Sequence, residues 1–350
     1  MKFRAAVYAE AHKPMVVDEV EAPDPGPRHV LTKLFASGIC HSQLHQLDHP
    51  YMPLPALMGH EATGVVAAVG SEVTHVKEGD YVFVTWVPRD AKDGMAPAAS
   101  AQATWRGKTF DTGTYTWAEY CLMEERYIVK TEPDIPTDVT AVIGCAVLTG
   151  SGTVTNVAKV QAGDSVAVFG AGGVGLCAVA AAAVAGARPL IVVDLDEAKL
   201  EFARRFGATH AINASGGDPV ETVRQLTSGG ADFAFDAIGV PVTQRQILES
   251  VRPGVTGLRE GGTAVLIGVP GTESATLDLR SMVLGAKSYR ASLGGTTRPE
   301  RDFPKYLEWH RTGKLDLNAL VTKRYKLAEI NEAVDDLAKG RIFGRSIIEF

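Results

Sequence analysis

The chain has 350 residues, of which 45% are hydrophobic, and this length and apolar content predict two domains with separate buried cores. Its 35 lysines and arginines against 41 aspartates and glutamates give a net charge of −6, and no run of five basic residues occurs. These values argue against nucleic acid and anionic membranes as partners.

The first eight residues have no sustained apolar stretch behind their two basic residues, so they predict a strand and not a signal peptide. We therefore expect a cytoplasmic protein. The four cysteines are too few and too scattered for a disulfide framework in a chain of this length. Two of them, Cys121 and Cys177, are expected to be buried apolar residues.

Up to about residue 145, short β-branched segments alternate with Pro and Gly, as in 30–35, 63–69 and 81–84, and this texture predicts a mostly β domain. From about residue 148 strands and helices alternate, which predicts a doubly wound parallel sheet. We expect these elements at 166–169, 174–185, 190–193, 197–206, 233–236, 242–251 and 263–269. After about residue 292 we expect a helix, a strand, a helix and a last strand at 301–312, 321–325, 327–339 and 346–350.

The stretch 165–187 has 23 residues without a charge, which meets the length criterion for a membrane span. Its glycines and alanines make it only mildly apolar, and the β-rich residues before the glycines break a single-helix pattern. The segment is therefore expected to form a strand, a tight turn and a buried helix.

Four of the nine histidines fall between positions 41 and 60, next to Cys40. Together with the later Cys145, this cluster offers two thiolates and an imidazole, the donor set of a catalytic zinc with an open fourth position. The motifs are Cys40-His41-Ser42, then His45, then Gly59-His60-Glu61, and finally Ile143-Gly144-Cys145.

A dinucleotide-binding loop is predicted at Gly170-Ala171-Gly172-Gly173-Val174-Gly175. Gly170 permits the tight turn, Gly172 lets the backbone approach a pyrophosphate, and Gly175 lets the helix pack closely on the strand. Asp194 ends the next predicted strand 19 residues after Gly175, where a ribose-binding acid is expected. Because positions 195–198 contain no arginine to bind a 2′-phosphate, NAD is favoured over NADP.

In order and spacing, these motifs resemble the zinc-containing medium-chain alcohol dehydrogenases along almost the whole chain. The resemblance implies an α/β protein with a β-rich GroES-like catalytic domain at 1–146 and 293–350 and a Rossmann NAD-binding domain at 147–292. The active site would lie in the cleft between them. Relatives are dimers or tetramers, so a homodimer or homotetramer is expected.

The resemblance also assigns roles to single residues. The zinc ligands would be Cys40, His60 and Cys145, with Glu61 in the second sphere. Ser42 would take the alcohol proton and pass it through the nicotinamide ribose to His45, which delivers it to solvent.

Further contacts follow from the same resemblance. The expected cofactor contacts are His41 and Arg345 at the pyrophosphate, Lys199 at the adenosine ribose, and Ile267 and Val269 behind the nicotinamide, beside the loop residues Gly173 and Val174; Trp86 is expected in the substrate pocket. Several of these residues have an ordinary alternative. His41 and Lys199 would be solvated, Ile267, Val269 and Trp86 would be core residues, and Glu61 would be an acid at the start of a strand.

Two features depart from the family pattern. Many relatives have an Asp at position 43 that supports the zinc histidine, whereas this chain has Gln43, which can accept a hydrogen bond but cannot raise imidazole basicity as a carboxylate does. The stretch 87–108 has no cysteine, although relatives often hold a structural zinc there with four. We therefore expect one catalytic zinc per chain, no structural zinc, and a rebuilt lobe at 87–112.

Three functions remain open from the sequence. The first is an NAD-dependent zinc alcohol dehydrogenase that acts on small alcohols, aldehydes or ketones. The second is a zinc lyase or aldehyde dismutase on the same scaffold, which uses tightly bound NAD. The third is a nucleotide-sensing protein without chemistry, and the joint presence of Cys40, Ser42, His45, His60 and Cys145 argues against it.

Overall fold

The computed structural model describes residues 1–49, 52–89, 98–271 and 274–350. Contacts divide the chain into two units. The first comprises Met1–Cys145, Arg298–Glu308 and Leu317–Phe350, and the second comprises Ala146–Thr297 and Trp309–Asp316. Residues 90–97, part of the lobe expected to be rebuilt, lie outside the described residues.

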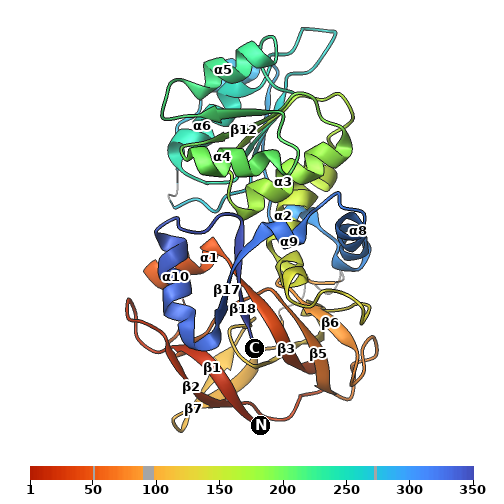
Figure 1. The fold of residues 1–350 in the computed structure, drawn as a ribbon, viewed down its shortest axis with the longest axis vertical. Helices are drawn as coiled ribbons and strands as arrows, with labels where there is room; N and C mark the ends of the chain where they lie inside the picture. Colours follow the sequence, from red (N-terminus) through yellow and green to blue (C-terminus); the bar gives the residue numbers. More distant parts are fainter. Residues whose placement is uncertain (50–51, 90–97, 272–273) are drawn as a thin grey trace. The chain divides into compact units, whose positions relative to one another are not determined.

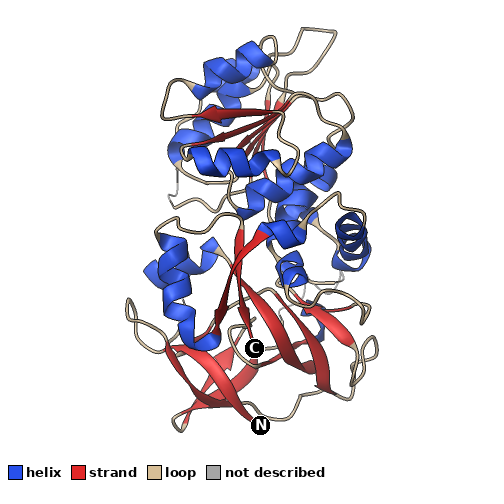
Figure 2. Ribbon diagram, viewed as in Figure 1, coloured by secondary structure: helices blue, strands red, loops and turns tan. Residues whose placement is uncertain are grey.

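The described strands of the first unit form two sheets (Figures 1 and 2). One has the strand order β4-β1-β2-β7-β8, and the other has the order β10-β6-β5-β3-β18-β17, with β9 also paired to β3. The strands are β1 (Lys2–Tyr8), β2 (Val16–Glu21), β3 (His29–Ile39), β4 (Ala56–Leu57), β5 (Ala62–Val69), β6 (Tyr81–Val84), β7 (Ala101–Trp105), β8 (Lys108–Thr112), β9 (Tyr120–Glu124), β10 (Ile128–Lys130), β17 (Val321–Lys326) and β18 (Arg345–Glu349). The last two strands of the chain, β17 and β18, thus join the sheet that contains β3.

The helical segments around these sheets include α1, which follows β3 directly. Their bounds are α1 (His41–Asp48), the short 3₁₀ segments Glu125–Tyr127, Val139–Gly144 and Leu327–Glu329, α8 (Pro299–Arg311), α9 (Leu317–Leu320) and α10 (Ile330–Ala338). Strand β18 runs antiparallel to β3 and pairs Ser346 with Ile39. This register brings Arg345 next to the end of β3, from which α1 departs.

A β-hairpin occupies part of the segment 87–112. In it, β7 and β8 pair Trp105 with Lys108, so Arg106 and Gly107 form a two-residue loop. Both loop residues have positive φ, 48° and 77°, as a tight hairpin turn requires. The Trp105 indole and the Arg106 guanidinium both donate to Asp18 on β2, which ties the hairpin to the sheet.

Six parallel strands form the sheet of the second unit, in the order β13-β12-β11-β14-β15-β16. Helices cover both faces of this sheet (Figure 1), which makes the unit a doubly wound Rossmann fold. The strands are β11 (Val166–Phe169), β12 (Leu190–Asp194), β13 (His210–Asn213), β14 (Phe233–Asp236), β15 (Thr263–Leu266) and β16 (Ser288–Ala291). The helices are α2 (Ala146–Gly152), the π-helix Thr153–Ala158, α3 (Gly173–Ala185), α4 (Glu197–Arg204), α5 (Pro219–Leu226), α6 (Pro241–Ser250), α7 (Leu279–Leu284) and the 3₁₀ segment Gly294–Thr296.

The uncharged stretch 165–187 forms the buried strand β11, a turn and the buried helix α3, as predicted. Neither α3 nor any other helix in the described ranges has both the length and the hydropathy that crossing a membrane requires.

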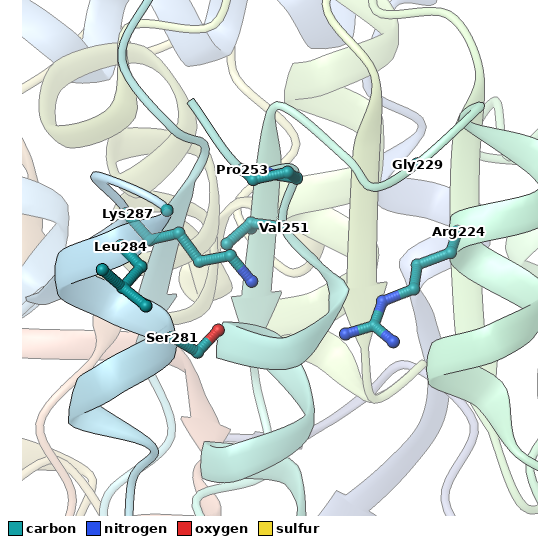
Figure 3. Close-up of a pocket in the computed structure, with 8 residues that line it drawn as sticks. Arg224, Gly229, Val251, Pro253, Ser281, Leu284 and Lys287 are labelled. Carbon is teal, nitrogen blue, oxygen red and sulfur yellow. The ribbon is translucent and has the colours of Figure 1, made fainter. Parts of the chain in front are cut away.

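A cavity of about 420 Å³ lies in the second unit beside Arg224, Ser281 and Lys287 (Figure 3). The two cationic side chains that line it, those of Arg224 and Lys287, already have hydrogen-bond partners. Arg224 donates to the carbonyl oxygen of Glu249 at 2.8 and 3.1 Å, and Lys287 donates to that of Leu248 at 3.1 Å. They therefore satisfy carbonyl groups in the last turn of α6, where cations are favourable.

Candidate metal centre and nucleotide loop

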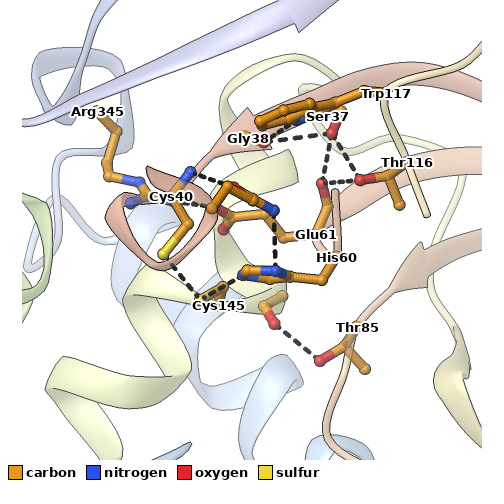
Figure 4. Close-up of polar contacts among 12 residues, drawn as sticks. Ser37, Gly38, Cys40, His60, Glu61, Thr85, Thr116, Trp117, Cys145 and Arg345 are labelled. Atoms are coloured by element: carbon orange, nitrogen blue, oxygen red, sulfur yellow. Dashed lines mark hydrogen bonds and ion pairs between the residues drawn. The ribbon is translucent and has the colours of Figure 1, made fainter. Parts of the chain in front are cut away.

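The metal-ligand atoms of Cys40, His60 and Cys145 all lie within 4.8 Å of one another. His60 Nε2 is 3.2 Å from Cys145 Sγ, and the two sulfur atoms are 3.8 Å apart (Figure 4). Both cysteines are buried and His60 is half-buried. The structure thus brings together three residues that are up to 105 positions apart in sequence.

Three different elements present these ligands. Cys40 is the N-cap residue of α1, and Cys145 follows the 3₁₀ segment Val139–Gly144. His60 lies between β4 and β5, directly after Gly59, whose φ of +98° only glycine adopts readily. A Cβ at Gly59 would also meet Thr116 Oγ1 at 2.4 Å, so this turn needs glycine on both counts.

The electrostatics of the centre favour a thiolate at Cys40. The hydrogen bond from the Cys145 thiol, the charge of Arg345 and the contact with His60 together hold the pKa of Cys40 well below its ordinary value, although burial opposes this. A thiolate is the form of cysteine that binds zinc. Two converging sulfur donors and one imidazole nitrogen therefore fit Zn²⁺.

Glu61 and Arg345 form a buried ion pair behind the ligands (Figure 4). Their side chains are 0% and 6% exposed, so this ion pair is shielded from solvent. Arg345, expected at the cofactor pyrophosphate, is thus engaged with the carboxylate that follows His60.

Gln43 is 1% exposed and contacts two of the three ligand residues. Its Oε1 accepts from the Cys40 N–H at 2.8 Å, and its Nε2 lies 2.9 Å from His60 Nδ1. The sequence suggested an amide that accepts from the imidazole. The structure instead turns the amide nitrogen towards it.

Helix α1 carries the three expected relay and phosphate residues. Ser42 and His45 are half-buried, one helical turn apart, and His41 is exposed. The rings of His41 and His45 meet edge to face, with centroids 5.8 Å apart. Trp86, expected near the substrate, packs edge to face against His60 at 6.4 Å, and its indole Nε1 is buried without a partner among the described residues.

Three polar residues that no sequence motif had indicated hold the ligand loops in place (Figure 4). Ser37 and Thr116 both donate to the carbonyl oxygen of Glu61, at 3.0 and 3.4 Å. Thr85 donates to that of Gly144 at 2.8 Å, next to Cys145. Serines and threonines at these positions carry no recognisable spacing, so sequence reasoning had no signal to find them.

The predicted nucleotide loop joins β11 to α3 in the second unit. Strand β11 lies between β12 and β14, and the later strands of the chain are added on one side of it after the earlier ones have been added on the other. A Cβ at Gly172 would meet no atom of the described residues within 4 Å, whereas one at Gly175 would meet the Gly170 carbonyl oxygen at 1.8 Å. The loop therefore leaves open space at Gly172 and close packing at Gly175. This is the shape in which a backbone approaches a pyrophosphate.

Asp194 ends β12 and bonds to this loop. Its Oδ2 accepts from the Ala171 N–H at 2.7 Å, and its Oδ1 accepts from the N–H groups of Leu195 and Asp196. Lys199 on α4 is half-buried. Beyond β15, Ile267 is 7% exposed and Val269 is 51% exposed.

Comparisons with known proteins agree with this architecture. The model of the alcohol dehydrogenase GroES-like domain matches residues 26–137, and that of the zinc-binding dehydrogenase domain matches residues 173–312. The chain is 33% identical to alcohol dehydrogenase class-3 of Cereibacter sphaeroides over the full length of both proteins. It is 34% identical to the NDMA-dependent alcohol dehydrogenase of Amycolatopsis methanolica, over 97% of each.

Solved structures with a similar fold also include alcohol dehydrogenases. The crystal structure of benzyl alcohol dehydrogenase from Acinetobacter calcoaceticus matches with a TM-score of 0.89 and 30% identity, over 100% of this chain and 99% of that one. An alcohol dehydrogenase zinc-binding domain protein from Burkholderia ambifaria matches with a TM-score of 0.90 and 30% identity over the same shares. The expected α/β fold and the family resemblance are thus confirmed, and the chain belongs to the zinc-dependent medium-chain alcohol dehydrogenase family.

Proposed function

We propose that this protein is an NAD-dependent zinc alcohol dehydrogenase that interconverts small alcohols with aldehydes or ketones. The observation that carries the proposal is the convergence of Cys40, His60 and Cys145 in a chain of this family. Three protein ligands leave a fourth position for a substrate oxygen, as in catalytic zinc sites.

A zinc ion held by these three residues would act as a Lewis acid and lower the pKa of a bound alcohol, as it lowers that of bound water to roughly 7. The chain's own groups then have three tasks. Cys40, His60 and Cys145 hold the metal, and Arg345, which is paired with Glu61, favours the thiolate form of Cys40. Trp86 packs against His60 and would border the substrate.

The proton of the alcohol must leave the site. Residues three positions apart on a helix are neighbours, so Ser42 and His45 lie on one side of α1. Ser42 would accept the hydroxyl proton and pass its own proton through the nicotinamide ribose hydroxyl to His45, which would deliver a proton to solvent, since an imidazole exchanges protons near neutral pH.

NAD would supply the hydride acceptor. The open backbone at Gly172 and the N-terminal amides of α3 suit its pyrophosphate, and the Asp194 carboxylate has acceptor capacity left for a ribose hydroxyl. The remaining contacts that we propose are those expected from the family resemblance: His41, Gly170, Gly173, Val174, Gly175, Lys199, Ile267, Val269 and Arg345.

The test is a panel of aliphatic, branched and aromatic alcohols with purified protein, zinc and NAD, in which both NADH absorbance and the carbonyl product are measured. Because one relative is named for its dependence on NDMA, each assay is run with and without that compound. We expect NADH and product in equal amounts. Product without free NADH would favour the dismutase alternative, and a Cys40→Ser variant that keeps full activity would refute the zinc mechanism.

A further inference from the structure

The buried Gln43 side chain lies between the backbone of one zinc ligand and the ring of another. Cys40 N donates to Gln43 Oε1 at 2.8 Å, which is the side-chain half of a helix capping box. The other end of the same amide, Nε2, is 2.9 Å from His60 Nδ1. One neutral group thus has two neighbours to satisfy.

The backbone decides which way the amide points. A backbone N–H can only donate, so the atom facing Cys40 must be the Gln43 oxygen. The amide nitrogen, which can only donate, is therefore left facing His60 Nδ1. That nitrogen must accept, so a neutral His60 carries its proton on Nε2.

The contact of the second imidazole nitrogen, His60 Nε2, is consistent with this tautomer. His60 Nε2 lies 3.2 Å from Cys145 Sγ, and Cys145 Sγ donates to Cys40 Sγ at 3.8 Å. Each group donates to the next, from the Cys40 N–H through Gln43, His60 and Cys145 to the Cys40 sulfur. With His60 in this tautomer, these four hydrogen bonds all run in the same direction.

Zinc requires the opposite arrangement at His60. The nitrogen that faces the two sulfur atoms is Nε2, so it must give up its proton to bind the metal, and the ring then carries its proton on Nδ1. Nδ1–H would face the NH₂ group of Gln43, and two donors would meet. Turning the amide over would satisfy Nδ1–H, but the NH₂ group would then face the Cys40 N–H.

We propose that Gln43 is a positioning residue that holds His60 in the Nε2–H tautomer while the centre is free of metal, so that zinc binding must break one of the two Gln43 hydrogen bonds. A carboxylate at this position would accept from both donors at once. The wild-type chain therefore binds zinc more weakly than a Gln43→Glu variant with no other change. The inference depends on the proposed zinc site but not on hydride transfer.

The first test observes the tautomer directly. Protein labelled with ¹⁵N-histidine is stripped of metal with a chelator, and the His60 ring nitrogens are observed by two-dimensional NMR, with His60→Asn to assign them. We expect the Nε2–H form in the metal-free wild type and the Nδ1–H form after zinc is added. Metal-free Gln43→Glu is expected to show the Nδ1–H form. An Nδ1–H form in the metal-free wild type would overturn the proposal.

The second test measures zinc affinity by competition with a chromophoric chelator. Gln43→Glu should bind zinc about 10–100-fold more tightly than the wild type, the range by which outer-shell partners alter metal affinity. Gln46→Glu is the matched control. It adds the same charge to α1 at a half-buried position, one helical turn beyond Gln43 and away from the N-cap residue Cys40. The proposal is wrong if both variants gain zinc affinity equally or if Gln43→Glu binds zinc no more tightly than the wild type.

These readouts separate the inference from the function. The tautomer of the wild type can be observed without catalytic activity. A protein that oxidises no alcohol but shows the expected tautomer change with zinc would refute the dehydrogenase proposal and support the role of Gln43.

Discussion

Glu61 and Arg345 pair in the interior although 284 positions separate them. The pairing of β18 with β3 brings them together, since Ser346 lies opposite Ile39. Removing one partner of a buried pair leaves the other charge uncompensated.

Arg345→Met should therefore lower the free energy of unfolding by about 3–5 kcal/mol, measured by chemical denaturation without metal or nucleotide. The double variant Glu61→Gln/Arg345→Met should recover part of this loss. Lys2→Met, in the exposed Lys2–Glu19 pair, is the control and should have little effect. Equal effects of Arg345→Met and Lys2→Met would contradict the buried pair.

A second prediction concerns His75, whose Nδ1 is 3.2 Å from Glu125 and whose Nε2 is 3.1 Å from the Ile128 carbonyl oxygen. Burial, together with the charge of Arg89, holds the pKa of His75 below the 6.5 of a free imidazole, although Glu125 opposes this. The unfolded chain therefore binds the proton first as the pH falls. The stabilising contribution is complete above pH 6.5 and is lost as the pH falls through the folded pKa.

Denaturation of the wild type and of His75→Gln between about pH 8 and pH 5 tests this. Below about pH 6.5 the stability of the wild type should fall more steeply than that of His75→Gln. His49→Gln, at an exposed position, should keep the wild-type slope. Parallel curves for all three proteins would show that His75 does not titrate differently on folding.

Much of the fold could be predicted because its central elements are buried. The strand β11 (Val166–Phe169) was predicted with its observed bounds, since a fully buried parallel strand is a continuous apolar run. The polar edge strands β13 (His210–Asn213) and β16 (Ser288–Ala291) were not predicted, because their sequences show no alternation and their neighbours hold them in place. Helix α5 does carry a sequence signal, because Asp218 can cap the helix and Pro219 follows it at the first helical position.

Part of the metal centre could also be predicted from the sequence. Motif order joins Cys40, His60 and Cys145 across the sequence, and the structure places them together. The orientation of the Gln43 amide was beyond sequence reasoning, because it depends on which neighbour takes the oxygen. Hydrogen-bond direction is a property of three-dimensional contacts and leaves no periodic pattern.

The third prediction is a preference for NAD over NADP. Asp194 can accept from an unmodified ribose but would repel a 2′-phosphate, and one repulsion of 1.4 kcal/mol gives about tenfold discrimination. We expect kcat/KM with NAD to exceed kcat/KM with NADP by more than about tenfold. Asp194→Ala should reduce this ratio, mainly by weakening the binding of NAD. Since Asp194 also binds the Ala171 N–H, Asp194→Asn is the control that keeps one acceptor for the loop. Equal kcat/KM values for the two cofactors in the wild type would refute the assignment.

The fourth prediction concerns the proton outlet. His45→Ala should slow alcohol oxidation near neutral pH by about 10²-fold, the low end for acid–base groups, because solvent can bypass a terminal relay residue. Zinc content should stay unchanged, and added imidazole should restore part of the rate. His49→Ala, at the C-cap of the same helix, should keep the wild-type rate. A His45→Ala enzyme with an unchanged pH–rate profile would leave His45 with a structural role only.

The fifth prediction is one zinc ion per chain. The ligand atoms of Cys40, His60 and Cys145 converge on a single position, whereas burial raises the pKa of Cys121 to about 12 and also raises that of Cys177, which makes both poor metal ligands. Elemental analysis of chelator-washed protein reloaded with zinc should give one ion per chain. Cys145→Ala should lose both zinc and activity, while circular dichroism and nucleotide binding should show a folded second unit, because that unit supplies no ligand to the centre. Cys121→Ala is the control and should retain the ion. Two ions per chain, or full activity with none, would refute the proposed mechanism.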